Sequence, residues 1–489
     1  MFIQYSILII YAFCLLAIFI FSIGQAFLIY YYIKSSKKEV KALSWHHQPK
    51  VTVQLPLFNE LYVVKRLIKS VCELDYPKEL LEIQVLDDST DDSLALTAQL
   101  VKEQQADGFN IKHITRTKNI GFKAGALQHG LEQASGELIA IFDADFVPSQ
   151  DFLQKLVPYF QDAKLGMVQS KWEHLNEDYS LLTKIQSFGL DGHFTVEQTG
   201  RNKQNLFINF NGTAGIWRKA CIVEAGGWQH DTLTEDLDLS YRAQLKGWKF
   251  KYVEDFSTPA ELPMELNAYK SQQHRWTKGA IETSKKMLSQ IWKSDESLAR
   301  KIFGSLHLLN SYAFLLVFTA SILSLPILVI KNLHLVDILY FNLMTIFVGG
   351  FIIVTIFYTT SYFSKKTSLL NFVKLFPVFL SFSMAMSFHN AIAVLEGIFG
   401  FKSDFIRTPK FNINNKKEGF KDNIYIKKSL PKSFYVELFL TFYFLSGMMM
   451  SFIYQDFGLL PFHTLLFCGF CMLNFYSIKH SLGGLKIKA

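Results

Sequence analysis

Two carboxylates follow an apolar run in residues 136–148, Gly-Glu-Leu-Ile-Ala-Ile-Phe-Asp-Ala-Asp-Phe-Val-Pro. The run of residues 138–142 has the length and the bounds of a buried strand, and Asp143 and Asp145 come directly after it. In an open α/β sheet, ligands collect outside the carboxyl ends of the strands. Carboxylate oxygens there suit a Mg²⁺ or Mn²⁺ ion that bridges a diphosphate, so both residues are candidate metal ligands. A solvated turn is the alternative, and the neighbouring motifs decide between the two.

A second strand ends in acid upstream of this motif. Residues 51–60 predict a strand closed by Pro56, and residues 82–86 predict another strand that runs into Asp87 and Asp88. Strands and helices that alternate in this way predict a parallel sheet with crossover helices. Asp87 or Asp88 would then hydrogen-bond the base or the ribose of a nucleotide. The alternative is an N-cap for a helix that starts near Ser93.

Residues 118–127, Lys-Asn-Ile-Gly-Phe-Lys-Ala-Gly-Ala-Leu, form a glycine-punctuated loop that leads into a helix. Backbone amides and Lys123 at such a helix start are suited to contact phosphate. The spacing is less strict than that of a Walker loop, and the prediction rests on the position of the loop between the two acidic strand ends.

Two later segments carry groups for sugar transfer. Asp236, in Thr234-Glu-Asp-Leu-Asp238, is a candidate general base that removes the proton of an acceptor hydroxyl during inverting transfer. Arg275 lies in Gln272-Gln-His-Arg-Trp276, and its charged, planar guanidinium could donate paired hydrogen bonds to a departing diphosphate. The aromatic face of Trp276 could pack against a sugar ring. The alternatives are solvent-facing helix charges for the acids and an interfacial anchor for the Arg-Trp pair.

The composition places these motifs in a membrane protein. Half of the 489 residues are hydrophobic and 46 are Phe, and the apolar excess lies before residue 34 and after residue 303. We therefore expect a cytosolic domain over residues 46–300 between membrane segments. The net charge of +8 indicates topology, because the middle of the chain has no basic stripe interleaved with aromatics and nucleic acid is not an expected partner. The five cysteines predict buried thiols.

Residues 3–33 predict a first spanning helix. Four lysines follow it and place the next domain in the cytosol and the N-terminus outside: Lys34, Lys37, Lys38 and Lys41. Within a membrane domain of residues 303–489, four further segments are long enough to span: 307–330, 336–363, 434–454 and 459–478.

Residues 369–399 are apolar but are broken by five residues: Lys374, Pro377, His389, Asn390 and Glu396. The next loop, residues 400–432, is rich in basic residues and should be cytosolic: Lys402, Arg407, Lys410, Lys416, Lys417, Lys421, Lys427, Lys428 and Lys432. Counting crossings then requires residues 369–399 to lie on or re-enter the membrane, which gives five crossings and one interfacial segment. The final lysines, Lys479, Lys486 and Lys488, also fall inside. The polar residues of the segment would face the interface or, alternatively, line a polymer path.

Four motifs in order resemble the processive branch of the family 2 glycosyltransferases, in particular the plant cellulose-synthase-like glucomannan mannosyltransferases and their bacterial relatives. They are the strand-end acid, Asp143-Ala-Asp145, Thr234-Glu-Asp236 and Gln272-x-x-Arg275-Trp276. The resemblance covers residues 51–285. It implies a GT-A domain, a donor bound through Asp88 (or Asp87) and the Asp-x-Asp metal, Asp236 as the base, and Gln272, Arg275 and Trp276 at the acceptor end. Asp143 is carried over as a contact to the substrate, and Lys123 and Glu235 are further expected contacts.

Residues 405–410, Phe-Ile-Arg-Thr-Pro-Lys, resemble the Phe-x-Val-Thr-x-Lys gating loop of cellulose synthases, with Arg407 in place of the valine. The resemblance implies that Thr408 and Lys410 close over the bound nucleotide. The departure at Arg407 leaves the mechanism of such a gate open.

The expected protein is thus an α/β GT-A domain, with a mostly parallel nucleotide-binding sheet, inserted in an α-helical multi-pass domain of the plasma (inner) membrane. It should transfer sugar from a GDP-mannose or UDP-glucose type donor, with Mg²⁺ or Mn²⁺, to a growing β-linked mannan or glucan. Related motifs also occur in enzymes that add one sugar to a membrane lipid of the ceramide or diacylglycerol type, and the sequence does not separate these products. A membrane transporter regulated by its nucleotide fold is a further alternative.

Overall fold

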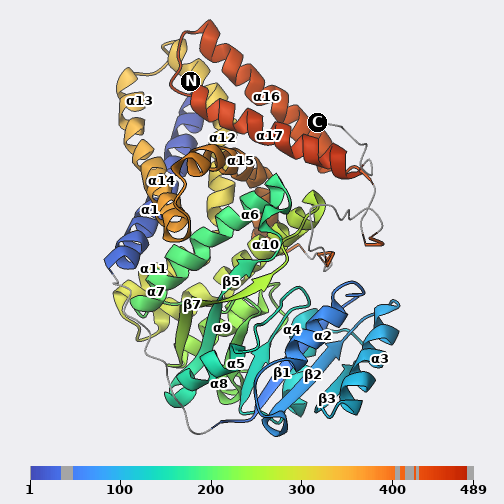
Figure 1. Cartoon of the computed structure of the whole chain (residues 1–489). Helices are drawn as coiled ribbons and strands as arrows, with labels where there is room; N and C mark the ends of the chain where they lie inside the picture. The colour runs from blue at the N-terminus through green and yellow to red at the C-terminus, as the bar shows by residue number, and fades with distance from the viewer. Residues whose placement is uncertain (1, 35–47, 402–407, 413–422, 426–428, 482–489) are drawn as a thin grey trace.

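The computed structural model describes residues 2–34, 48–401, 408–412, 423–425 and 429–481. Long helices form one half of the molecule and an α/β domain forms the other (Figure 1). The first helix, α1 (Phe2–Lys34), belongs to the helical half, where it packs on two helices from the C-terminal part of the chain, α12 (Tyr312–Asn332) and α14 (Val348–Lys365). The α/β domain is therefore inserted between helices that meet in space, as expected.

The α/β domain is built on one sheet, with seven strands in the described residues, in the order β3-β2-β1-β4-β6-β5-β7. The strands are β1 (Val51–Leu57), β2 (Leu81–Asp87), β3 (Ile111–Thr115), β4 (Leu138–Ile141), β5 (Leu165–His174), β6 (Gly215–Arg218) and β7 (Lys249–Ala260). All neighbours pair in parallel except β6, which runs antiparallel to β4 and β5. The mostly parallel sheet predicted from the strand and helix alternation is confirmed.

Pro56 does not close the first strand, because β1 continues through Leu57 in register with β2. The prediction was wrong at this point for a physical reason. On its other side β1 pairs with β4 only from Val51 to Gln54, so no ladder hydrogen bond is required of residue 56 on that side.

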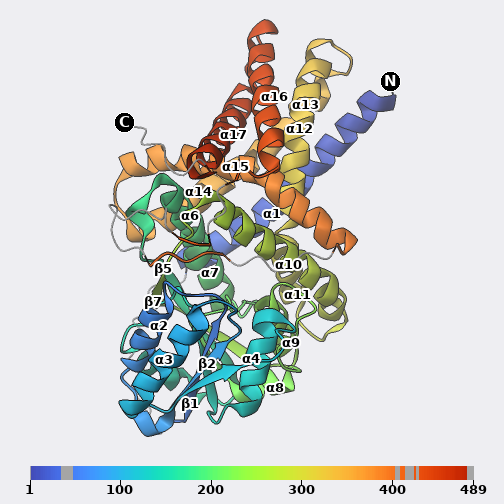
Figure 2. The same ribbon diagram turned by 90° about the vertical axis from the view of Figure 1, so that its right-hand side faces the viewer.

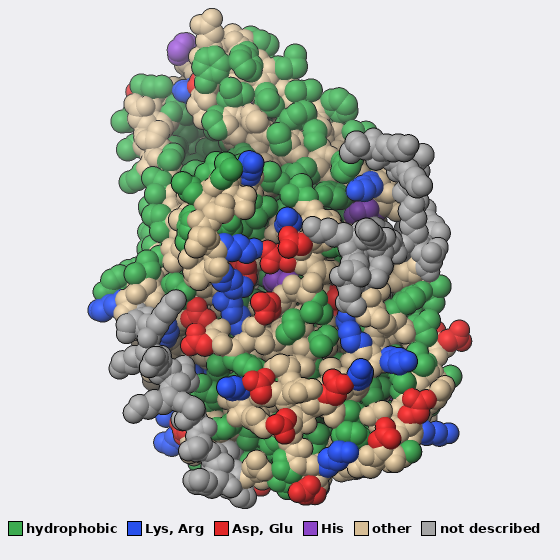
Figure 3. Space-filling model, in the orientation of Figure 1, with side chains coloured by type: hydrophobic (Ala, Val, Ile, Leu, Met, Phe, Trp, Pro, Cys, Tyr) green, Lys and Arg blue, Asp and Glu red, His purple; other side chains and the backbone are tan. Residues whose placement is uncertain are grey.

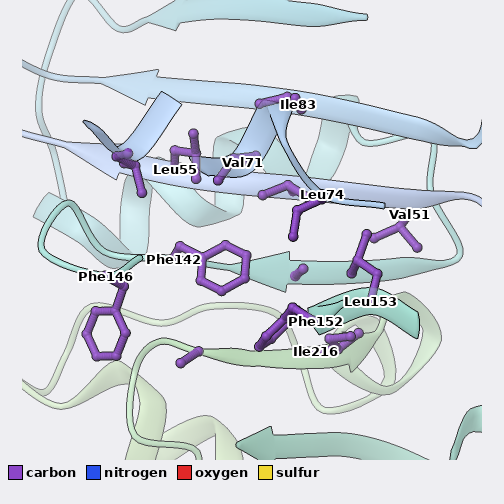
Figure 4. Packing of buried hydrophobic residues seen from close by; sticks show 14 of the residues in the cluster. Val51, Leu55, Val71, Leu74, Ile83, Phe142, Phe146, Phe152, Leu153 and Ile216 are labelled. Carbon is purple, nitrogen blue, oxygen red and sulfur yellow. The ribbon is translucent and has the colours of Figure 1, made fainter. Parts of the chain in front are cut away.

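Helices cover both faces of the sheet (Figures 1 and 2). They are α2 (Val64–Cys72), α3 (Ser93–Ala106), α4 (Phe122–Gln133), α5 (Phe152–Leu156), α7 (Gln198–Lys203), α8 (Lys219–Glu224) and α9 (Glu235–Leu245). Another helix, α6 (Leu181–Gly192), packs instead on α14 of the helical half. One core layer is made by Val51, Leu55 and Ile83 of the strands and by Phe142 and Phe152, whose ring centroids lie 4.8 Å apart (Figure 4). This packing fixes the strand β4 whose end carries Asp143 and Asp145.

Two helices lead from the sheet to the membrane half. α10 (Leu266–Lys293) packs against α9 and against α15 (Leu369–Phe399), and α11 (Leu298–Leu309) follows it. The span predicted to begin at His307 begins instead at Tyr312, since His307 still belongs to α11 and its Nδ1 lies 2.8 Å from the Tyr241 hydroxyl of the α/β domain.

The described residues contain six helices long and apolar enough to cross a membrane. They are α1, α12, the continuous pair α13 (Ile338–Met344) and α14, α15, α16 (Ser433–Ile453) and α17 (Leu460–Ser481). In Figure 3 the surface of the upper part of the molecule is mainly hydrophobic. Most charged side chains of this face lie in the lower part. The structure is therefore that of a multi-pass membrane protein, as the composition predicts.

By length and composition α15 is one of the six candidates, although the charge pattern predicts an interfacial segment. In Figures 1 and 2 it lies between the helical bundle and the α/β domain, and it packs on α10, α12 and α17. His389 Nε2 lies 3.0 Å from the Lys270 carbonyl oxygen, and Glu396 pairs with His274 at 3.0 Å. These polar residues of α15 thus contact α10, and the interfacial placement stays a prediction.

Several basic residues of the topology argument lie outside the described residues: Lys37, Lys38, Lys41, Lys402, Arg407, Lys416, Lys417, Lys421, Lys427, Lys428, Lys486 and Lys488. The first three residues of the gating-like motif, 405–407, are among the positions that the structure does not describe. All five cysteines are described and free, but the prediction of buried thiols is wrong for Cys468, which is exposed.

Candidate active site

A cavity of about 280 Å³ lies along the carboxyl edge of the sheet. The strand order places its walls in sequence, with Asp88 after β2 at one side, Asp143 and Asp145 after β4 in the middle, and the end of β5 at the other side. The predicted site residues that line it are Asp88, Lys123, Asp143, Asp145, Glu235, Asp236, Gln272, Arg275, Trp276, Thr408 and Lys410. The structure therefore brings together every predicted site residue except Asp87.

Lys123 lines this cavity and contacts three of its polar groups. Its Nζ lies 2.6 Å from Asp143 Oδ1 and 3.9 Å from Glu235 Oε1, and it donates a hydrogen bond of 3.0 Å to the carbonyl of Gly212. Burial lowers the pKa of Lys123, but Asp143 and Glu235 outweigh it and the pKa is raised above its ordinary value. The ammonium is thus held charged beside the carboxylates, where it is suited to bind phosphate oxygens.

Asp145 has one oxygen paired and one without a partner. Its Oδ2 lies 2.6 Å from Lys410 Nζ, and its Oδ1 is buried with no hydrogen-bond partner among the described residues. An unsatisfied buried carboxylate oxygen is costly unless a ligand satisfies it. Asp143 and Asp145 both line the cavity, and these two hard carboxylates would fit a divalent cation whose remaining ligands come from a diphosphate and water.

Asp236 occupies the first turn of α9. Its Oδ1 accepts a hydrogen bond of 2.8 Å from the backbone N–H of Leu237. Burial, together with the charge of Glu235, raises the pKa of this carboxyl to about 7. A carboxylate that titrates near neutral pH is well matched to accept a proton during turnover.

Two glycines leave room for Asp236 and for the start of its helix α9. Gly212 has φ +82°, and a Cβ there would lie 3.0 Å from Asp236 Oδ2. Gly279 of α10 packs against Thr234, where a Cβ would come within 2.5 Å of the threonine Cγ2. Because glycine has no side chain at either position, α9 can approach both the loop before β6 and the helix α10 closely.

The two acids after β2 have different surroundings. Asp87 is fully buried, with Oδ2 3.0 Å from His113 Nε2 and Oδ1 accepting from the backbone N–H of Ser89 at 2.9 Å, and it does not line the cavity. Burial raises the pKa of Asp87, but these hydrogen bonds lower it overall below the ordinary value. The prediction of Asp87 as a substrate contact is therefore not supported, because its carboxylate is turned into the protein.

Asp88 lines the cavity and is fixed by Arg116, whose guanidinium donates to both carboxylate oxygens, the Nε bond being 2.9 Å long. The alternative role of these acids as a helix cap is wrong. Asp91 Oδ1 instead accepts from the N–H of Ser93, at 3.0 Å, at the start of α3.

The Gln-x-x-Arg-Trp residues face the cavity from α10. Burial lowers the pKa of Arg275, and Glu235 and Asp143 oppose this effect, so the guanidinium stays a cation among acids. Trp276 lies with its ring centroid 6.5 Å from that of Trp172 at the end of β5.

The described part of the gating-like loop, residues 408–412, borders the cavity with Thr408 and Lys410. Glu261 anchors it, since its Oε2 accepts from the backbone N–H groups of Phe411, at 3.3 Å, and Asn412, at 3.2 Å, while Arg66 holds its Oε1 at 2.9 Å. Thr408 is buried, with no hydrogen-bond partner for its hydroxyl among the described residues. The loop thus places Thr408 and Lys410 beside the acidic centre.

The sequence reasoning missed five residues of the site: Arg116, Asn211, Trp172, His174 and Glu261. Trp172 and His174 end a strand at the same carboxyl edge as the Asp-x-Asp motif, and this position was a usable signal once β5 had been recognised. Arg116 also follows a strand. Glu261 acts through a loop some 150 residues away, and no local pattern indicates that contact.

Comparison with known proteins agrees with this geometry. Residues 48–279 match the model of "Glycosyltransferase like family 2". A probable glucomannan 4-beta-mannosyltransferase 4 of Oryza sativa subsp. japonica is 44% identical over 281 residues, 56% of this chain and 51% of the relative. The glucomannan 4-beta-mannosyltransferase 2 of Arabidopsis thaliana is 44% identical over 248 residues, 50% of this chain and 46% of the relative. The chain therefore spans about half the length of these curated relatives.

The fold is also found in a solved structure, the mannosyltransferase PcManGT from Pyrobaculum calidifontis in complex with GDP-Man and Mn²⁺. The two superpose with a TM-score of 0.55 at 18% identity, over 80% of this chain and 100% of the other. This likeness concerns the fold, which is the GT-A fold. With its sheet, its acidic strand ends and the match over residues 48–279, the α/β domain is similar to the glycosyltransferases of family 2.

Proposed function

We propose that the chain is a membrane-embedded inverting β-glycosyltransferase that extends a β-linked polysaccharide of the mannan or glucan class. The observation that carries this proposal is the placement of Asp236, with its pKa raised to about 7, in the same cavity as Asp143 and Asp145. The relatives are named glucomannan 4-beta-mannosyltransferases, which makes GDP-mannose the first donor to test and UDP-glucose the second.

The donor would lie along the sheet edge. Asp88, oriented by Arg116, would hydrogen-bond the nucleoside at one end of the cavity. Lys123 and Arg275 would bind the diphosphate at the centre, since both cations border the acidic strand end. Glu235 would accept a hydrogen bond from a donor hydroxyl, as it lies 3.9 Å from Lys123.

Asp143 and Asp145 would hold a Mg²⁺ or Mn²⁺ ion, which when bound neutralises part of the diphosphate charge. The fit rests on the unpartnered oxygen of Asp145. Lys410 already neutralises the other oxygen of Asp145, so this lysine would share that carboxylate with the ion or move to the diphosphate.

Asp236 would act as the general base. As the acceptor hydroxyl oxygen attacks the anomeric carbon, its proton passes to the Asp236 carboxylate, and the bond from that carbon to the diphosphate oxygen breaks on the opposite face. The electron pair of the broken bond stays on the nucleoside diphosphate, where Lys123 and Arg275 stabilise the charge. Attack from the face opposite the leaving group inverts the configuration at the anomeric carbon.

The acceptor would enter beside Gln272 and Trp276, where the cavity is bordered by α10 and α6. Both helices pack against membrane helices, α10 on α15 and α6 on α14 and α15. Thr408 and Lys410 would close the donor side after binding. We place the catalytic domain in the cytosol, the N-terminus outside and the chain in the plasma (inner) membrane, following the distribution of lysines.

The decisive experiment uses the full chain in lipid nanodiscs with Mg²⁺ or Mn²⁺ and radiolabelled GDP-mannose or UDP-glucose. Products are sized and then digested with linkage-specific hydrolases. A long β-linked chain from one donor would support the proposal and identify the sugar. Label restricted to a single-sugar lipid would replace it by the lipid-transferase alternative, and no transfer from any donor would favour a regulatory nucleotide fold.

A further inference from the structure

The far end of the cavity, at the last residues of β5, contains polar groups that the proposed mechanism does not use. Trp172 and His174 both line this end. The indole Nε1 of Trp172 and both ring nitrogens of His174 are buried and have no hydrogen-bond partner among the described residues. Three unsatisfied polar atoms at one end of a cavity are costly in the free protein and indicate a ligand that satisfies them.

The rings at this end form a rigid wall. Trp172 packs between Phe146, at a centroid distance of 5.1 Å, and Phe194, at 4.9 Å. Its ring lies 6.5 Å from that of Trp276 at an angle of 55°. Two tryptophans that meet at an angle offer apolar faces to a sugar ring, while the polar nitrogens are left for its hydroxyls.

His174 is suited to recognise hydroxyl groups. Burial and the nearby charge of Lys365 lower the pKa of His174 to about 4, so the ring is neutral at physiological pH. A neutral imidazole has one donor and one acceptor nitrogen, so it can donate to one hydroxyl group or accept from one.

The position of this wall indicates which substrate it serves. β5 lies three strands from β1 and four from β2, the strand whose end carries Asp88, with Asp143 and Asp145 between them. The β5 side is next to the membrane half, since Lys365 at the end of α14 lies near His174, the last residue of β5. A polymer that leaves towards the membrane would pass this side, whereas the nucleotide would occupy the other.

We propose that Trp172 and His174, opposite Trp276, form the subsite for the terminal hexose of a β-linked glycan acceptor and determine which acceptor is used. The proposal rests on the function proposed above and assigns the acceptor end of that cavity. Trp172 would donate its indole N–H to one hydroxyl, and a ring nitrogen of His174 would bind another.

The test measures transfer by the full chain in nanodiscs to added β-1,4-linked manno- and gluco-oligosaccharides. Trp172→Phe removes the N–H and keeps an aromatic ring, and His174→Phe removes both ring nitrogens. Each should raise the acceptor KM at least about tenfold, equivalent to ~1.4 kcal/mol, while the Kd of the nucleoside diphosphate stays within about twofold. His174→Gln, which restores one donor and one acceptor, should recover most of the acceptor affinity.

The matched control is Trp228→Phe, because Trp228 also has a buried indole N–H without a partner in the described residues but does not line the cavity. This variant should keep the wild-type acceptor KM. An acceptor KM within twofold of wild type in both Trp172→Phe and His174→Phe would overturn the inference. Failure of the proposed function is distinguishable, since wild-type protein would then transfer no sugar to any oligosaccharide. If His174→Phe does not fold, Trp172→Phe decides.

Discussion

Replacing Asp236 by asparagine should stop sugar transfer and leave the site intact. The amide oxygen of asparagine can still accept the 2.8 Å hydrogen bond from the N–H of Leu237, so the start of α9 should keep its geometry. The change removes the group that takes the acceptor proton. General-base catalysis contributes ~10² to 10⁴ in rate, and kcat should fall by that factor. The donor contacts that we assign to Asp88 and Lys123 are untouched, so donor Kd should change by less than about tenfold.

The pH dependence gives a sharper test of the same residue. Burial and Glu235 raise the pKa of Asp236 to about 7, and the base acts only when it is ionised. In the wild type kcat/KM should therefore decrease about tenfold per pH unit below pH 7. Glu235→Gln removes the neighbouring negative charge, so the pKa of Asp236 should fall. The decrease in kcat/KM should then begin at a lower pH.

Stability provides a readout that does not depend on turnover. An aspartate in the unfolded chain titrates near pH 4, whereas Asp236 in the folded protein keeps its proton up to about pH 7. Between these values the unfolded state binds fewer protons than the folded state, so this residue makes stability fall as the pH rises. Asp236→Asn removes that component, and its Tm relative to wild type should be higher at pH 8 than at pH 4.5.

The assays are transfer from radiolabelled donor, calorimetric titration of nucleoside diphosphate, and thermal unfolding in detergent. Asp231→Asn serves as the control, because Asp231 is 58% exposed and lies outside the cavity. The reasoning would be refuted by Asp236→Asn turnover within about tenfold of wild type. The explanation of the raised pKa would be refuted if kcat/KM of the wild type decreased only near pH 4. It would also be refuted if Glu235→Gln left the pH of this decrease unchanged.

The remaining predictions concern the cavity and the topology. Lys410→Ala should tighten Mn²⁺ binding several-fold in the absence of nucleotide, because the ammonium lies 2.6 Å from Asp145, and Mn²⁺ electron paramagnetic resonance measures this; weaker binding would contradict it. Lys123→Met should weaken nucleoside diphosphate binding by about tenfold or more, as seen by calorimetry, and an unchanged Kd would exclude Lys123 from the phosphate site. Glu261→Gln should loosen the loop it anchors and speed its cleavage in limited proteolysis, whereas an unchanged rate would show that other contacts hold the loop. Reporter fusions after residue 420 should behave as cytosolic, and extracellular behaviour would overturn the crossing count.

The parts of the site that were predicted share one property. Asp143, Asp145 and Lys123 each follow a strand or open a helix, and the alternation of strands and helices fixes the sheet edge where they meet. Local sequence therefore contains enough information to place them together. Asp236, Arg275 and Trp276 were candidates because of their chemistry, but only the resemblance to a family indicated that they share this site, since no local pattern gives their positions.

The errors came from contacts made at a distance. Asp87 and Asp88 are adjacent in the chain, but His113 draws one into the protein and Arg116 holds the other at the cavity. Adjacent residues on a strand point to opposite faces, and only the side chains from the next strand and loop decide which face is the site.

From the sequence alone, the parallel sheet, the acidic strand ends and the apolar membrane segments of this protein could be determined, because periodicity and strand ends are local properties of the chain. Only the tertiary structure decided that Asp88 and not Asp87 faces the cavity, that Lys410 reaches Asp145, and that β5 contributes its own wall. These facts depend on packing between segments far apart in the chain. Burial by that packing also raises the pKa of Asp236, and no spacing of residues predicts how deeply a carboxylate is buried.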